Sequence, residues 1–200
     1  MNKCQFLFKE SKTIITKSNL PDTDYVINPY IGCQFGCCYC YASFMGRFVN
    51  KSISEWGEYV FVKSNGADLI KKELAKLIKT SPNSKILLSS VTDPYQAAEA
   101  KYKLTRKILG AIGELQYPEM INILTKSPLV LRDTDILKTI PQVEVGLTIT
   151  TTDDAMSKAL EFNAPGATNR LKALEKLNKQ GFATYAFIGP LLPHYALNAQ

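Results

Sequence analysis

Three closely spaced cysteines constrain this chain more than any other feature of its sequence. Cys33, Cys37 and Cys40 lie in residues 28–41, a short stretch that also carries two glycines. The C-x3-C-x2-C spacing allows three soft thiolates to converge on one centre, and such a donor set favours an iron–sulfur cluster or zinc over hard cations. A [4Fe–4S] cluster normally takes four cysteine ligands. A loop with three therefore predicts one open iron, a position at which chemistry can occur.

A structural zinc site is the first alternative for these cysteines. It needs a fourth ligand, for which Cys38, Cys4 and the single histidine, His194, are the candidates. Cys38 follows Cys37 directly and is expected to point away from it, whereas Cys4 is remote in the sequence. Disulfides are a second alternative, but clustering of this kind in a chain without secretory features favours a metal over bridges. We expect Cys4 and Cys38 to be small apolar fillers.

The composition is that of a globular protein with a substantial core. The chain has 200 residues, 46% of them hydrophobic, which is enough for one domain. It has no apolar run long enough to cross a membrane, and its first residues do not resemble a signal peptide. We therefore expect a cytoplasmic location and no membrane partner. The net charge of +6 leaves a nucleic-acid partner open without requiring one.

Apolar periodicity predicts alternating strands and helices over most of the chain. The expected strands are residues 25–28, 85–91, 120–124, 143–149 and 183–188. The expected helices are residues 67–79, 104–115, 132–140 and 169–180. Asp133 is expected to cap the third helix, and Gly181 to close the fourth. Apolar strands separated by amphipathic helices indicate an α/β fold with a parallel sheet and right-handed crossovers, and both doubly wound and barrel architectures fit this pattern.

The cysteine loop resembles the cluster motif of the radical S-adenosylmethionine (radical SAM) superfamily, C-x3-C-x-aromatic-C, with Tyr39 in the aromatic position. The resemblance implies that Cys33, Cys37 and Cys40 hold a [4Fe–4S] cluster whose fourth iron is chelated by S-adenosyl-L-methionine. It implies reductive cleavage of that cofactor to a 5′-deoxyadenosyl radical, which abstracts hydrogen from a substrate. It also implies an electron donor such as flavodoxin or ferredoxin.

The same resemblance favours a barrel over a doubly wound sheet. Radical SAM enzymes have a partial (β/α)6 TIM-like barrel whose cluster loop follows the first strand, here residues 25–28. Five strands are expected by residue 188, so we expect the last strand and helix to be missing from a C-terminally truncated chain. The predicted organisation is a single radical SAM core domain over residues 1–200, with an N-terminal extension at 1–24 and the partial barrel at 25–200.

Four further patches resemble the radical SAM group related to spore photoproduct lyase, a DNA repair enzyme. They are residues 91–96 with Glu99, residues 125–127, residues 129–133 and residues 165–171, within a resemblance that extends over roughly residues 28–193. Each patch lies at or just after the carboxyl end of an expected strand, where the active sites of barrels are found.

Site roles in the first half of the chain follow from this resemblance. Tyr39 is expected near the adenine of the cofactor, with packing beneath the loop as the alternative. Ser90 and Thr92 are expected to share one face of the second strand and to meet the methionine part of the cofactor. Asp93 is expected either to orient these hydroxyls or to cap the turn that follows.

Further roles fall after the third and fourth strands. Lys126 is expected to pair with the cofactor carboxylate, the alternative being a surface lysine at a strand end. Thr148 and Thr150 are expected to share a strand face and to touch the ribose or the carboxylate, unless they only fill strand positions. Arg170 is expected to reach the carboxylate or to begin a helix. His194 is expected to be structural.

One departure from the lyase pattern concerns the second strand. Spore photoproduct lyase carries a cysteine at the end of this strand that returns a hydrogen atom to the product radical, and residues 88–93 contain none. A hydroxyl such as that of Ser90 holds its hydrogen far more strongly than a thiol does. We therefore predict a radical SAM enzyme, lyase-like or transferase-like, with an unassigned substrate. The alternatives are a nucleic-acid repair or modification enzyme of the lyase type, and a non-enzymatic zinc-binding module.

Overall fold

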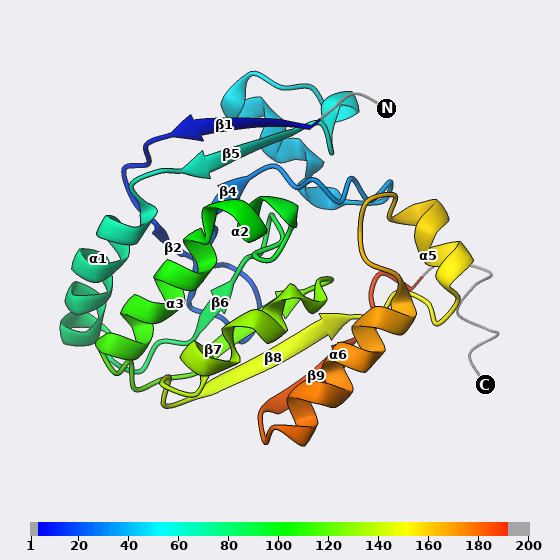
Figure 1. Cartoon of the computed structure of the whole chain (residues 1–200). Coiled ribbons are helices and arrows are strands. Elements are labelled where there is room, and N and C mark those ends of the chain that lie inside the picture. Colours follow the sequence, from blue (N-terminus) through cyan, green and yellow to red (C-terminus); the bar gives the residue numbers. More distant parts are fainter. Residues whose placement is uncertain (1–3, 192–200) are drawn as a thin grey trace.

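Sequential parallel strands form the largest sheet of the molecule. A computed structural model of the chain describes residues 4–191 (Figure 1). The sheet has six strands in the order β2-β3-β6-β7-β8-β9. They span Ile15–Lys17 (β2), Tyr25–Ile27 (β3), Ile86–Leu88 (β6), Ile121–Thr125 (β7), Val143–Thr148 (β8) and Ala183–Phe187 (β9). β2 pairs antiparallel with β3, whereas all other neighbours pair in parallel.

The strand order decides between the two architectures that the sequence allowed. From β3 onward each strand pairs with the next parallel strand along the chain, so every crossover moves in the same direction across the sheet. A doubly wound sheet reverses that direction at a switch point, and no reversal occurs among these strands. The predicted α/β fold of the partial TIM-like barrel type, with five parallel strands by residue 188, is confirmed.

Helices and short turns connect the strands. The α-helices are Gly66–Thr80 (α1), Ala97–Tyr102 (α2), Leu104–Glu114 (α3), Thr134–Leu137 (α4), Asp154–Leu160 (α5) and Ala167–Lys179 (α6), and the 3-10 helices are Tyr41–Val49 (η1), Ile53–Glu55 (η2) and Pro128–Asp133 (η3). Figure 1 shows α1 and α3 along one flank of the sheet and α6 against β8 and β9. None of the helices within residues 4–191 has the length and apolar character that a membrane span requires.

The core lies between the strands and these helices. The apolar stripe that predicts α1 is buried at Ile70, Leu74 and Leu77, and α3 buries Ile108 and Ile112. Burial of each such side chain stabilises the fold by roughly 1.5–3 kcal/mol. This packing makes the sheet and its outer helices a rigid support for the loops at the carboxyl ends of the strands.

The structure contains a second, smaller sheet that the sequence did not predict. Its order is β1-β5-β4, with strands Gln5–Lys9 (β1), Tyr59–Lys63 (β5) and Tyr30–Ile31 (β4). Figure 1 shows it crossing above the larger sheet. β4 follows β3 directly and leads into the cysteine loop, so its pairing with β5 anchors the start of that loop. The N-terminal stretch assigned to an extension supplies β1 to this sheet and β2 to the larger one.

Two local predictions differ from the structure. The second parallel strand ends at Leu88 rather than Val91, because Ser89 adopts a left-handed conformation (φ 72°) that cannot continue a strand. The helix expected over residues 132–140 is a 3-10 turn, η3, followed by the short α4. Asp133 occupies the N-cap position of α4 but forms no capping hydrogen bond, since arginine side chains engage its carboxylate.

Candidate cluster and cofactor site

A cavity of about 460 Å³ lies at the carboxyl ends of the parallel strands, beside the cysteine loop. Eight of the ten residues that the sequence assigned to the site contribute to its wall: Cys33, Cys37, Tyr39, Cys40, Ser90, Thr92, Lys126 and Thr148. Thr150 and Arg170 do not line it. Parallel strands end at one edge of a sheet, and the crossovers therefore bring residues that are distant in sequence to this one space.

The three motif cysteines contribute their side chains to the cavity wall. Cys33 and Cys37 are buried and Cys40 is half-buried. Burial raises the pKa of the Cys37 thiol to about 12 and holds the pKa values of Cys33 and Cys40 above the usual value. Cys38 is exposed and lies outside the wall, as its adjacency to Cys37 predicts. Such thiols become thiolates when a metal centre compensates their charge.

The donor set suits a cluster better than a single ion. Within residues 4–191, no group of three or more His, Cys, Asp or Glu side chains is arranged to hold a metal ion, which gives the zinc alternative no support. A [4Fe–4S] cluster makes a different demand, because each cysteine binds a separate iron and the thiols need only face a common space. Cys33, Cys37 and Cys40 satisfy that condition in this cavity. His194, the remaining candidate ligand, lies outside the described residues.

Side chains from the ends of β3 and β6 hold the cysteine loop in place. Asn28 accepts a hydrogen bond on Oδ1 from the backbone N–H of Ser90 at 3.0 Å, joining the two strand ends. The Thr92 hydroxyl donates to the Gly32 carbonyl at 2.6 Å and accepts from Gln96 at 2.9 Å. Thr92 therefore lines the cavity with its hydroxyl proton committed to the cysteine loop.

The expectation that Ser90 and Thr92 share a strand face is wrong. Both residues lie beyond Leu88, the last residue of β6, and reach the cavity from a loop. The preceding residue, Ser89, also lines the cavity, and its buried hydroxyl has no hydrogen-bond partner within the described part of the chain. The left-handed backbone at Ser89 turns the chain at this point, a feature that periodicity cannot reveal.

Asp93 connects the β6 loop to the end of β7. Its carboxylate accepts from the Tyr95 N–H (2.8 Å), the Thr125 hydroxyl (2.6 Å) and the Lys126 N–H (2.8 Å). Burial raises the pKa of Asp93, although these three hydrogen bonds oppose the rise. Of the two expected roles, capping the turn is confirmed, and the hydroxyl that Asp93 orients is that of Thr125. The same contacts fix the backbone from which Lys126 projects.

A buried carboxylate, Glu161, lies behind the cavity wall. The Tyr39 hydroxyl donates to its Oε1, the Thr150 hydroxyl donates to the same oxygen at 2.9 Å, and the Lys126 ammonium lies 3.8 Å from it. Lys126 Nζ is also 5.9 Å from the centre of the Tyr39 ring. Glu161 thus joins the cysteine loop, through Tyr39, to the ends of β7 and β8.

Arg170 neutralises Glu161 and does not reach the cavity. Its guanidinium donates to Glu161 Oε2, to the Ser157 hydroxyl (3.2 Å) and to the carbonyls of Pro165 (2.7 Å) and Thr148 (3.1 Å). Burial opposes ionisation of Glu161, but the hydrogen bond and charge of Arg170 outweigh it and lower the pKa of this carboxyl. The predicted contact of Arg170 with a cofactor carboxylate is therefore not supported, because every guanidinium nitrogen already has a partner.

Thr148 and Thr150, which were expected to share a strand face, have different environments. Thr148 ends β8 and lines the cavity, whereas Thr150 lies beyond the strand, donates to Glu161 and has its hydroxyl oxygen 3.2 Å from that of Tyr39. They do not share a strand face.

Sequence reasoning missed Glu161 and Trp56 as residues of this region. Nothing in the chain distinguishes Glu161 from other glutamates, whereas Trp56 is the single tryptophan.

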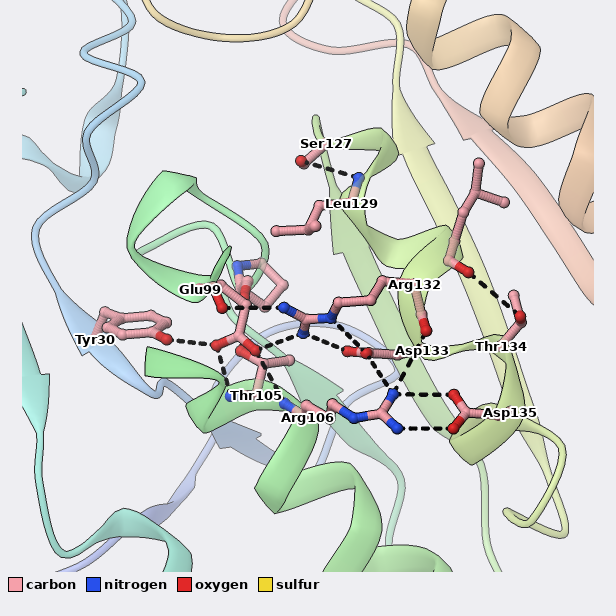
Figure 2. A network of polar contacts seen from close by, with 12 residues as sticks. Tyr30, Glu99, Thr105, Arg106, Ser127, Leu129, Arg132, Asp133, Thr134 and Asp135 are labelled. Atoms are coloured by element: carbon pink, nitrogen blue, oxygen red, sulfur yellow. Dashed lines mark hydrogen bonds and ion pairs between the residues drawn. The ribbon is translucent and has the colours of Figure 1, made fainter. Parts of the chain in front are cut away.

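Two of the patches that resemble the lyase group form a structural network (Figure 2). Glu99 is fully buried and accepts from Arg132 at 2.8 Å and from the Tyr30 hydroxyl. Asp133 accepts from Arg132 (2.7 Å) and Arg106 (2.8 Å). These contacts join β4, α2, α3 and η3. Glu99, Arg132 and Asp133 from these two patches therefore hold neighbouring elements of this chain together.

A comparison with known protein families covers the residues that form this site. The family model described as "Radical SAM superfamily" matches residues 27–195, which include the cysteine loop and every strand from β4 onward. The chain belongs to the radical SAM superfamily. Membership is consistent with the cavity lined by Cys33, Cys37 and Cys40 and explains the sequential parallel sheet on which it lies.

Two uncharacterized proteins from other organisms are similar to this chain. Uncharacterized protein MJ0683 of Methanocaldococcus jannaschii is 41% identical over 192 residues, covering 96% of this chain and 70% of that protein. Uncharacterized protein Rv2578c of Mycobacterium tuberculosis is 28% identical over 173 residues, covering 84% of this chain and 50% of that protein.

Solved structures of spore photoproduct lyase share the fold. The complex with dinucleoside spore photoproduct matches with a TM-score of 0.74 at 18% identity, over 94% of this chain and 52% of that one. A variant with bound AdoMet and dinucleoside spore photoproduct matches with a TM-score of 0.75. This radical SAM chain thus spans about half the length of the solved structures that it matches.

Proposed function

We propose that this chain is a radical SAM enzyme that holds a [4Fe–4S] cluster through Cys33, Cys37 and Cys40 and binds S-adenosylmethionine in the adjoining cavity. When bound, the two groups supply one-electron cleavage of the sulfonium and a 5′-deoxyadenosyl radical that abstracts hydrogen from a substrate. The observation that carries the proposal is that three motif thiols and Lys126 line one cavity in a member of this superfamily. A flavodoxin or ferredoxin is the proposed electron donor.

The charges around the cavity support cofactor binding by Lys126. Glu161 forms its closest ionic contact with Arg170, whereas its distance to the Lys126 ammonium is 3.8 Å. Two cations therefore share one carboxylate, and Lys126 retains positive charge toward the cavity that it lines. A carboxylate at that point would complete the balance, and an amino-acid cofactor carries one.

Aromatic residues of the cavity wall are suited to hold an apolar ring and to exclude water. The Tyr39 hydroxyl is held by Glu161 and Thr150, which fixes the orientation of the ring where it lines the cavity. Its face is then available for the adenine, as an offset-stacked contact requires. Phe35 and Trp56 line the same space and reduce its contact with bulk water.

Anaerobic reconstitution tests the proposal as a whole. The chain is incubated with iron, sulfide and a thiol reductant, then reduced and supplied with S-adenosylmethionine. We expect a brown protein with absorption near 400 nm that releases 5′-deoxyadenosine. A colourless chain that binds zinc and releases no nucleoside would contradict the proposal and restore the zinc-binding module.

Lys126→Ala is expected to weaken S-adenosylmethionine binding without loss of iron. A charge-assisted contact with a carboxylate contributes roughly 1.5–3 kcal/mol, which corresponds to about a ten- to hundredfold change in affinity. The measurement is a titration of the reduced protein with the cofactor, followed by the change in its electron paramagnetic resonance signal. Lys172→Ala, on the exposed face of α6, is the matched control. Equal affinities in the two variants would remove Lys126 from the site.

The substrate of spore photoproduct lyase is not expected to be the substrate of this chain. Among the described residues, the cysteines that line the cavity are the three proposed cluster ligands. The end of β6 presents Ser89 and Ser90, whose O–H bonds are too strong to return hydrogen as a thiol does. We expect release of 5′-deoxyadenosine without efficient conversion of spore photoproduct to thymines.

The assay for this negative prediction combines the reconstituted chain, dithionite, S-adenosylmethionine and an oligonucleotide that contains the lesion. Release of 5′-deoxyadenosine in the same tube verifies that the radical chemistry is active. Repair over multiple turnovers would overturn the prediction and favour a DNA repair lyase.

A further inference from the structure

Trp56 places an unpaired hydrogen-bond donor beside the proposed cluster ligands. Its indole lines the same cavity as the three cysteines and packs in one small apolar cluster with Cys33, Cys37 and Cys40. Its Nε1 is buried and has no hydrogen-bond partner among the residues that the structure describes. Buried donors in folded proteins are nearly always paired. An unpaired donor in the wall of a proposed cofactor cavity indicates that its acceptor is present only when the cofactor is bound.

The backbone around Trp56 holds the indole against the cysteine loop. A capping box formed by Ser52 and Glu55 begins η2, and the Trp56 N–H donates to the Ile53 carbonyl at 3.1 Å. The next residue, Gly57 (φ 98°), lies so close to the cysteine loop that a Cβ there would be 2.9 Å from the Gly36 Cα. Only a glycine fits this approach.

Ring packing fixes the indole further. The Trp56 and Tyr59 rings meet edge to face, with centroids 6.2 Å apart and an interplanar angle of 79°. The position of Trp56 is therefore determined by the turn, the glycine contact and the neighbouring ring. None of these contacts uses the indole N–H.

The Cys40 sulfur is the acceptor that we assign to the Trp56 N–H. Of the three cysteine sulfurs, that of Cys40 is the one that the indole N–H approaches, although the two groups lack the geometry of a hydrogen bond. The thiolate sulfur is a far better acceptor than the thiol, because it carries a negative charge. The indole N–H consequently finds its partner when Cys40 binds iron.

We propose that Trp56 Nε1 donates a hydrogen bond to the Cys40 thiolate of the bound cluster and thereby raises the reduction potential of that cluster. Hydrogen bonds to the sulfurs withdraw electron density and favour the more negative, reduced state. Trp56 is a positioning and tuning residue in this scheme, because it touches a ligand and neither the substrate nor the reacting atoms. The inference rests on the proposed function, since it requires that Cys40 bind a cluster.

Trp56→Phe removes the N–H and keeps an aromatic ring in the wall. We expect its reconstituted cluster to be harder to reduce by about tenfold in equilibrium constant, which is ~59 mV for one electron. The matched control is Tyr59→Phe, which removes from the adjoining ring another buried hydroxyl that has no partner within residues 4–191 and lies outside the cavity wall. The control is expected to keep the wild-type potential. Redox titration followed by electron paramagnetic resonance measures all three proteins.

A second measurement needs no substitution. Because the chain contains a single tryptophan, indole labelled with 15N marks one nitrogen only. Pulsed electron paramagnetic resonance of the reduced wild-type cluster is expected to show coupling to this 15N and to one proton that exchanges in D2O. Both signals are expected to persist in Tyr59→Phe.

The outcomes separate this inference from the proposed function. A wild-type chain that assembles no cluster overturns both. A cluster that forms in all three proteins, with one common potential and no 15N coupling, overturns the hydrogen bond and leaves the proposed function intact. A lower potential in Trp56→Phe alone, together with 15N coupling in the wild type, supports the inference.

Discussion

Replacing any one of Cys33, Cys37 or Cys40 by alanine is expected to abolish assembly of the [4Fe–4S] cluster. The three thiols line one cavity, and the sequence offers no nearby substitute, since Cys38 is exposed outside the wall. Two thiolates cannot hold a cubane that already has one iron without a protein ligand. Iron content and absorption near 400 nm after anaerobic reconstitution measure the loss, which we expect to be nearly complete.

Cys4→Ala and Cys38→Ala are the matched controls for the ligand variants. Each removes one thiol from the same chain, and neither residue belongs to the cavity wall. Both are expected to retain wild-type iron content. Loss of the cluster in Cys38→Ala, combined with its retention in Cys33→Ala, would contradict the ligand assignment.

Glu161→Ala is expected to produce a large loss of stability. Glu161 and Arg170 are both about 1% exposed and form a buried ion pair, and removal of the carboxylate would leave the guanidinium charge buried. Breaking such a pair from one side costs about 3–5 kcal/mol. The Tyr39 and Thr150 hydroxyls would lose their acceptor at the same time. Urea denaturation of the chain without cofactors measures the change in the free energy of unfolding.

Two comparisons separate this effect from a general loss of charge. Glu175→Ala breaks an exposed pair with Lys179 and is expected to leave stability unchanged, because exposed ion pairs contribute little. The double variant Glu161→Ala/Arg170→Met removes both charges and is expected to recover much of the lost stability. If Glu161→Ala unfolded at the same urea concentration as Glu175→Ala, the pair would not stabilise the site.

Much of the fold was predictable from the sequence because local patterns agree with the tertiary structure. Helical spacing in residues 67–79 corresponds to α1, whose Ile70, Leu74 and Leu77 are buried. The apolar runs correspond to β6, β7, β8 and β9 within a few residues at each end. Gly181 follows α6 with φ 85°, as a helix-closing glycine should. These signals depend only on neighbours along the chain.

The small sheet and the ends of the strands were not predictable in the same way. β4 has two residues and pairs with β5 far along the chain, so its formation depends on contacts that no local window contains. The end of β6 depends on the left-handed backbone of Ser89, a residue type with no strong preference for it. Asp133 has the chemistry of a helix cap, but nearby arginines engage it more strongly in the folded chain.

The sequence by itself determined the donor set that we propose for the cluster. Cysteine spacing defines the donor set, and a spacing of a few residues keeps Cys33, Cys37 and Cys40 on one loop. Only the tertiary structure decided which distant groups reach that loop. It brings Lys126 and Thr148 to the cavity, turns Arg170 away into an ion pair with Glu161, and packs Trp56 with the three cysteines. The physical reason is that parallel crossovers bring strand ends together in space, whereas the direction of each side chain follows from packing and burial around it.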